Sequence, residues 1–448
     1  MLLKRTLLAI VVLALPSRVM AGAVNVPCSS PFVFSKAAVN AVILPYSLPP
    51  ALGSQSEAGN KLGGLVQLET IMSIAKFGSI GVVQLVNDSR GACTPEAVLD
   101  KLTGKRPGAR EVMARGNGLI LIWGRIFQSG QDLFLQSYIR FVRHGVEESI
   151  DMPVGDRTLT GTLSTQAFAC APRKIALRDL QAIERQFAAS RLLHTEPSAT
   201  SPTRPIAQDP FSYWITDVRG DWVKLQSMSS PSATAPFGGW IQARAQDEQW
   251  SLRRQMPELY FVEAVAGYLS ARVPQNRGAV SQRALQNAES ALTRYLEAWG
   301  ANAVLGSDAA AGGTPLAVAV PRQLAGFMTL LRGTSPEAIG QARTQFDRAA
   351  ALVPQSSAAR HLAALASIAQ AYRQPSADRS PQRFIEELRT LLGTDPDNAQ
   401  MLRNLMAVYD LALAPAAGAP SSWELSAADR EQLTKQRESL KGLVKASS

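Results

Sequence analysis

GLILIWGRIFQSGQDLFLQSYIRFV, residues 118–142, is the clearest structural pattern in the first third of the chain. Two apolar runs, residues 119–127 and 133–142, flank Ser129-Gly130, a pair typical of a tight turn. The stretch predicts a β-hairpin with two long strands. Strands of this length need a helix or a second sheet to cover their apolar faces.

Strand and helix patterns alternate on both sides of this hairpin. The helix that starts at Thr94-Pro95-Glu96 has a capping hydroxyl, a proline at the first helical position and an early acid. We therefore expect an α/β layer domain with a mixed sheet. Its other expected strands are residues 38–44, 80–86, 148–154 and 158–170, and its other expected helices are residues 60–76 and 176–193.

The order of these elements resembles the amino-terminal domain of TolB and the related domains of flagellar and curli outer-membrane assembly proteins. Gly116-Asn117-Gly118 and Gly124 stand where those families carry a Gly-Ala-Asp-like turn and a strand glycine, so the turn departs from the family pattern. The resemblance covers about 150 residues. It implies a domain over residues 24–190 that takes part in assemblies of the cell envelope.

The first 23 residues have the layout of a signal peptide. Lys4 and Arg5 precede a short apolar run, residues 7–15, and Ala21 and Ala23 supply small residues for cleavage. No later run reaches the ~18 apolar residues of a spanning helix. We expect export to the periplasm, or secretion, and no transmembrane segment in the mature chain.

The charge of the chain argues against a nucleic-acid partner. Removing Lys4, Arg5 and Arg18 from the 46 basic residues leaves 43 against 36 acidic ones, a net charge of +7. The basic residues are scattered, which favours weak attraction to anionic envelope polymers over nucleic-acid binding.

The three cysteines, Cys28, Cys93 and Cys170, all lie in the first third of the chain. An oxidising compartment allows one disulfide and leaves one thiol. The sequence leaves all three pairings open. Since no CxxC is present, the cysteines predict neither a metal site nor a redox motif.

YWITDVRGDWVKL, residues 213–225, contains an Arg-Gly-Asp tripeptide between two apolar runs. Gly220 and Asp221 favour a tight turn, so a hairpin explains the tripeptide better than an adhesion signal. The order Tyr-Trp-Ile-Thr-Asp-Val-x-Gly-Asp-Trp, followed by a loop and Gly-Trp-Ile, resembles the bacterial SH3 domain. The resemblance implies a small β-barrel over residues 191–250 with an aromatic groove for a peptide or a glycan. The residues expected to bind are Tyr213, Trp214, Trp222 and Trp240.

The chain after Pro257 reads as helical. Ala342, Phe346, Ala349 and Pro354 have the small–bulky–small–proline spacing that resembles the second helix of a tetratricopeptide repeat. This implies an all-α solenoid over residues 255–413, with a concave surface for a partner. Residues 414–448 are expected to form a linker and a final helix that Ser426 and Asp429 cap.

No catalytic set is visible in the sequence. The three histidines, His144, His194 and His361, fall in three different expected domains, which disfavours a metal site or a catalytic triad. Ser73 and Lys76 match SxxK without its partner motifs. We therefore expect no cofactor, no metal and no enzymatic activity, and we expect the adjacent acids Glu147 and Glu148 to be solvated.

The fold class expected overall is multidomain α+β: a mixed α/β sheet domain, a small SH3-like β-barrel and an all-α tetratricopeptide-like solenoid. The function that this favours is a non-catalytic periplasmic scaffold or adaptor that binds envelope proteins, peptidoglycan or an outer-membrane assembly. The alternative is an enzyme or regulator of cell-wall processing that the SH3-like domain targets to its substrate.

Overall fold

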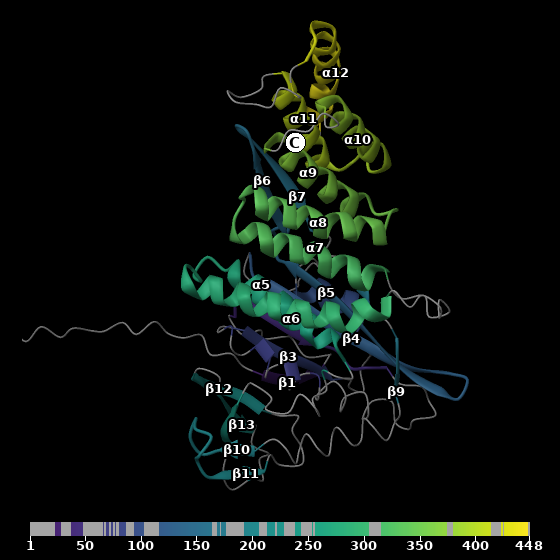
Figure 1. The fold of residues 1–448 in the computed structure, drawn as a ribbon. Helices are drawn as coiled ribbons and strands as arrows, with labels where there is room; N and C mark the ends of the chain where they lie inside the picture. The colour runs from purple at the N-terminus through teal and green to yellow at the C-terminus, as the bar shows by residue number, and fades with distance from the viewer. Residues whose placement is uncertain are drawn as a thin grey trace, which may run out of the picture.

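The computed structural model describes the strands and helices given below and several connections between them (Figure 1). The described residues are 23–27, 37–47, 66, 69–70, 73–74, 77, 80–86, 94–102, 116–163, 168–170, 172–175, 192–205, 213–219, 222–227, 238–242, 253, 256–303, 315–373, 380–413, 423 and 425–446. Together they form a mixed α+β protein with a mixed sheet.

Among the described residues, the large sheet has seven strands. Its order is β1 (Ala23–Pro27), β3 (Ile80–Val86), β2 (Val39–Ile43), β4 (Gly118–Ser129), β5 (Asp132–Arg143) and β8 (Phe168–Ala169), and β9 (Arg173–Ile175) also pairs with β5. The first four are parallel neighbours, and β5 runs antiparallel to β4, β8 and β9. Every residue of β2 is buried, as expected for a central strand with covered faces.

The predicted hairpin and the strands beside it are confirmed. β4 and β5 pair along their whole length, from Gly118 opposite Arg143 to Ser129 opposite Asp132. Helix α2 (Pro95–Leu102) begins as predicted, because the Thr94 hydroxyl accepts a hydrogen bond from the Ala97 amide at 3.2 Å.

Two sequence predictions in this region are partly wrong. The strand expected over residues 158–170 is two strands, because β7 (Arg157–Thr162) pairs with β6 (Ser149–Val154) as a separate hairpin and β8 joins the large sheet. The helix expected over residues 176–193 does not reach its last residues, which belong to strand β10 (Leu192–His194). Residues 176–191 lie outside the described part.

The second sheet is antiparallel, in the order β11 (Thr203–Pro205), β10, β14 (Gly238–Gln242), β13 (Trp222–Ser227) and β12 (Tyr213–Arg219). β12 and β13 form the hairpin predicted around the tripeptide, with Arg219 opposite Trp222. Among the described strands β11 and β12 are edges that do not pair with each other, so a closed barrel is not shown.

Helix α5 (Glu258–Ala271) joins the large sheet to the remaining helices. All of its residues except Tyr260 are buried, because β2, β4 and β5 cover one side and α6 (Ala279–Ala303) covers another. Gly267 allows the close approach of α6, since a Cβ there would lie 2.8 Å from the Cβ of Ala288.

The later helices pack on one another in chain order and lead away from the sheet to the C-terminus (Figure 1). They are α7 (Pro315–Arg332), α8 (Pro336–Leu352), α9 (Ser357–Arg373), α10 (Pro381–Thr394), α11 (Ala399–Leu413) and α12 (Ala427–Ala446). The predicted cap of the last helix is confirmed, as Ser426 Oγ accepts from the Asp429 amide at 3.1 Å and donates to Asp429 Oδ2 at 2.6 Å. One continuous apolar core includes residues of the large sheet, of the β6–β7 hairpin and of these helices.

Candidate interaction surfaces

The β6–β7 hairpin packs against one side of the helical array. β6 contacts α7 and α9, and β7 contacts α9 and α11, so the hairpin runs along alternate helices of the array (Figure 1). The sequence suggested that this array would offer a concave surface to a partner. The chain's own hairpin occupies the side of α7, α9 and α11 that it contacts. A concave surface for a partner stays a prediction.

An asparagine holds the outer edge of β7. Asn404 of α11 accepts a hydrogen bond from the Thr160 amide at 2.9 Å, and its Nδ2 donates to the Thr160 carbonyl at 2.7 Å. Its side-chain amide therefore pairs with a strand residue much as another strand would. Asn404 is 1% exposed, and His361 Nε2 lies 3.1 Å from its Nδ2.

Two glycines let the hairpin lie close to α9. A Cβ on Gly161 would be 2.5 Å from a methyl carbon of Leu362, and one on Gly155 would be 2.8 Å from the hydroxyl oxygen of Tyr372. Any side chain larger than that of glycine at these two positions would therefore push the hairpin away from α9.

Two arginines fix the same hairpin at its tip. Arg373 donates to the Pro153 carbonyl at 3.1 Å, and Arg157 lies 3.7 Å from Asp410 of α11. Contacts from α9 and α11 thus reach both strands, which makes the seam between hairpin and helices a built interface.

The small β-sheet carries the predicted aromatic residues. Trp240 in β14 is 4% exposed, and two cations lie over its ring, Arg219 at 5.0 Å and Lys224 at 5.9 Å. Trp222 is partly buried and meets the ring of His194 edge-on at 4.9 Å. A ligand would therefore meet the exposed Arg219 and Lys224 before it met the face of Trp240.

For the other two predicted aromatic residues, the structure describes the strand but not the side chains. Tyr213 and Trp214 lie in β12, opposite Ser227 and Gln226 of β13. Their side chains lie outside the described part of the structure.

Glu148 is buried, contrary to the prediction that it is solvated together with Glu147. Tyr268 donates to Glu148 Oε2 at 2.8 Å, and Arg143 and Arg272 lie 3.3 and 3.9 Å from its oxygens. Burial raises the pKa of this carboxyl, while Tyr268 and the arginines act against that shift. The cluster ties the base of the β6–β7 hairpin to α5.

A second buried carboxyl, Glu258, ties α5 to the sheet. The Ser137 hydroxyl of β5 donates to Glu258 Oε1 at 2.5 Å, and the Tyr46 hydroxyl lies 3.2 Å from Ser137 Oγ. Burial raises the pKa of Glu258 and of Tyr46. Gly124 makes room for the Tyr46 ring, since a Cβ there would lie 2.1 Å from it.

Sequence reasoning missed Glu258, Ser137 and Asn404. The one local signal was Gly124, because a glycine inside an apolar strand often marks a close approach.

The residues considered for catalysis or metal binding lie in different elements of the structure. His144 follows β5, His194 lies in β10 and His361 lies in α9. Ser73 is buried and its hydroxyl donates to the Glu69 carbonyl at 2.5 Å, and its motif partner Lys76 lies outside the described residues. Within the described ranges no group of three His, Cys, Asp or Glu side chains is arranged to hold a metal ion.

Cys170 is a free, buried thiol whose pKa burial raises. It therefore forms neither of the two disulfides that the sequence allowed it. Cys28 and Cys93 lie outside the described residues.

None of the helices that the structure describes is long and apolar enough to cross a membrane. No protein-family model matches the chain, and no curated protein matches it.

Proposed function

We propose that this chain is a non-catalytic scaffold of the bacterial cell envelope. It is exported to the periplasm, where it binds envelope proteins or peptidoglycan. Its proposed parts are a TolB-like α/β domain over residues 24–190, an SH3-like module over residues 191–250 and a tetratricopeptide-like array over residues 255–413.

The observation that carries the proposal is that three buried polar side chains each link two elements of the structure. Glu148 links the hairpin to α5, Glu258 links α5 to the sheet, and Asn404 links α11 to the hairpin. Each group joins two distant parts of the chain, which favours a body that presents surfaces at fixed positions. A scaffold needs such a body.

The test is capture from a solubilised envelope fraction with the tagged, mature protein under mild crosslinking, in parallel with co-sedimentation with purified sacculi. We expect enrichment of one protein or of peptidoglycan. Trp222→Ala, at a partly buried position of the small sheet, should reduce retention if this module binds. Arg283→Gln, at an exposed position of α6, is the control.

A preparation that retains neither protein nor sacculi would overturn the proposal. Turnover of purified peptidoglycan by the protein would favour the alternative, an enzyme or regulator of cell-wall processing.

A further inference from the structure

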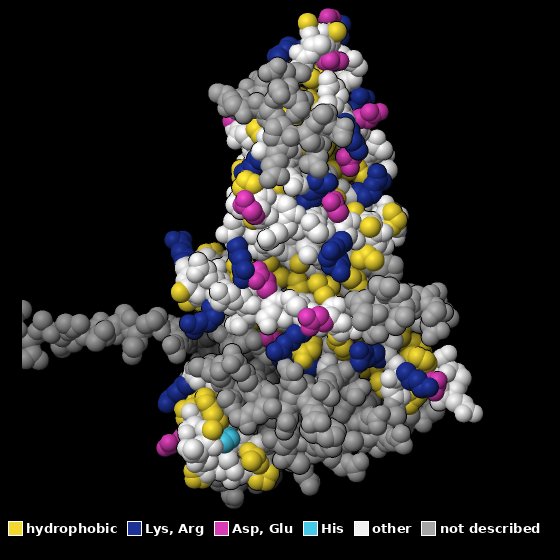
Figure 2. Space-filling view, viewed as in Figure 1, with side chains coloured by type: hydrophobic (Ala, Val, Ile, Leu, Met, Phe, Trp, Pro, Cys, Tyr) yellow, Lys and Arg dark blue, Asp and Glu magenta, His cyan; other side chains and the backbone are white. Residues whose placement is uncertain are grey.

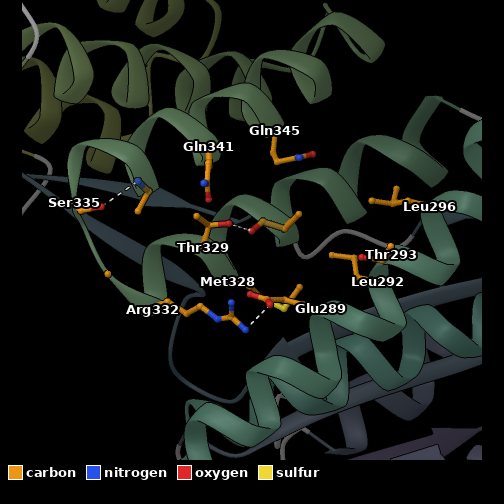
Figure 3. Close-up of a pocket in the computed structure, with 13 residues that line it drawn as sticks. Glu289, Leu292, Thr293, Leu296, Met328, Thr329, Arg332, Ser335, Gln341 and Gln345 are labelled. Carbon is orange, nitrogen blue, oxygen red and sulfur yellow. Dashed lines mark hydrogen bonds and ion pairs between the residues drawn. The ribbon is translucent and has the colours of Figure 1, made fainter.

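The described helices carry a second candidate surface, apart from the hairpin. A groove of about 660 Å³ lies between α6, α7 and α8 (Figure 3). None of the residues that line it belongs to the β6–β7 hairpin. Figure 2 shows hydrophobic side chains at the same level, between α6 and α7. The groove is therefore a surface that the chain's own hairpin leaves available.

The groove has an apolar floor and polar rims. Leu292 of α6 and Met328 of α7 are buried at its base. Thr293 and Gln341 line it from two sides and are exposed (Figure 3). An apolar floor with amide and hydroxyl groups at the edge suits an extended peptide, because the backbone of the peptide needs hydrogen-bond partners while its side chains seek burial.

The length of the groove sets the size of its ligand. Ala325, Thr329 and Arg332 line the groove along one side of α7, over roughly 10 Å at the rise of an α-helix. At about 3.3 Å per extended residue, this length accommodates about three residues.

The two ends of the groove differ in charge. At one end Arg332 forms an ion pair with Glu289 at 2.5 Å, so its charge is compensated. At the other end Gln345 lines the groove, and its Oε1 accepts a hydrogen bond from Arg322 at 3.1 Å. Arg322 and Arg348 lie beyond the lining residues, and neither forms an ion pair with a described residue.

The pKa of Arg322 is lowered from its ordinary value, first because the guanidinium is partly buried and then because Arg348 lies near it. A bound carboxylate would offset both effects. Arginine is well suited to hold a carboxylate through two parallel hydrogen bonds.

We propose that the groove between α6, α7 and α8 binds an extended, acidic segment of a partner protein. About three residues lie in the groove, and a carboxylate of the segment pairs with Arg322 and Arg348 just beyond its end. The inference rests on the proposed scaffold function and names the chemistry of its ligand.

The probe is a phage-displayed library of random decapeptides, selected on the full mature protein. Enriched peptides are then synthesised, and their affinity is measured by fluorescence polarisation. Gln341→Trp fills the groove from an exposed helix position, and the double variant Arg322→Gln, Arg348→Gln removes the two charges. Thr390→Trp on α10 and Arg283→Gln on α6 are matched controls at exposed positions outside the groove.

We expect enriched peptides to combine apolar residues with Asp or Glu. Gln341→Trp and the arginine double variant should each weaken their binding by about tenfold or more, and the controls should leave it within about twofold. Circular dichroism and thermal unfolding of each variant establish that it is folded.

Three results would overturn the inference: no enriched peptide, enriched peptides without acids, or binding to either groove variant that is as tight as binding to the wild type. Binding of soluble peptidoglycan fragments, in place of peptides, that Gln341→Trp abolishes would also overturn it. In each case the scaffold proposal would still stand if the envelope capture retained a partner, so the two failures are distinguishable.

Discussion

The side-chain amide of Asn404 forms two hydrogen bonds with the backbone of Thr160, 244 positions away in the sequence. The Thr160 amide donates to Oδ1 at 2.9 Å, and Nδ2 donates to the Thr160 carbonyl at 2.7 Å. The edge of a strand is thereby paired by a helix side chain. Unpaired strand edges are prone to pair with other chains, so this contact also protects the hairpin.

Asn404→Ala should lower the free energy of unfolding by about 2–4 kcal/mol, because it removes two hydrogen bonds and leaves the partly buried backbone amide and carbonyl of Thr160 unpaired. Urea unfolding followed by circular dichroism measures the change. Arg403→Ala, at an exposed position of the same helix, is the control and should cost less than about 0.5 kcal/mol. Equal effects of the two variants would show that the pairing contributes nothing to stability.

Gly155→Ala should destabilise the protein more than Gly130→Ala. Both glycines have a positive φ, +57° and +62°, so both substitutions carry a backbone cost of about 1–2 kcal/mol. Only at Gly155 would the new Cβ also meet Tyr372, while nothing lies within 4 Å at Gly130. Thermal unfolding of the two variants compares them, and equal losses would contradict the close contact between the hairpin tip and α9.

His361 should contribute a loss of stability as the pH falls from about 6.5 to 4. Burial lowers the pKa of His361 from 6.5 to about 4, so the unfolded chain binds a proton in this range that the folded chain does not. Between pH values above 6.5 and pH 4.5, protonation of His361 in the unfolded chain lowers the free energy of unfolding by about 2–3 kcal/mol. His361→Gln should remove this part of the pH dependence, as measured by urea unfolding at pH 7.5 and 4.5. Parallel pH profiles of wild type and variant would contradict it.

The one disulfide that an oxidising compartment allows should join Cys28 and Cys93. Cys170 is free and buried, and Cys28 directly follows Pro27, whose strand β1 pairs with β3 at Val86. Alkylation under non-reducing, denaturing conditions followed by peptide mapping should label Cys170 alone. Labelling of all three cysteines would show that no disulfide forms, and labelling of Cys28 or Cys93 alone would show a different pairing.

Local sequence patterns predicted much of the fold. The β4–β5 hairpin followed from two apolar runs around Ser129-Gly130, and the cap of α12 followed from Ser426 and Asp429. These features depend on residues that are close in the chain, so a short window of sequence contains the information.

Features that depend on distant residues were not predictable. Glu148 follows another acid and was expected to be solvated, yet its partners Tyr268 and Arg272 are more than 100 positions away. The packing of the β6–β7 hairpin against α7, α9 and α11 was not predicted for the same reason, since no sequence feature near Asn404 points to Thr160. The aromatic residues of the small sheet were located correctly in strands, but the covering of Trp240 by two cations was not foreseen.

The helices α7, α9 and α11 hold the chain's own β6–β7 hairpin. Hydrogen–deuterium exchange of the mature protein measures how firmly they do so, because an isolated two-stranded hairpin is marginally stable in water and its amides exchange quickly. We predict that the amides of residues 157–162 exchange slowly in the wild type, with protection close to that of β4 and β5, and quickly in Asn404→Ala. Complete exchange of residues 157–162 within seconds in the wild type, while β4 and β5 stay protected, would contradict the account.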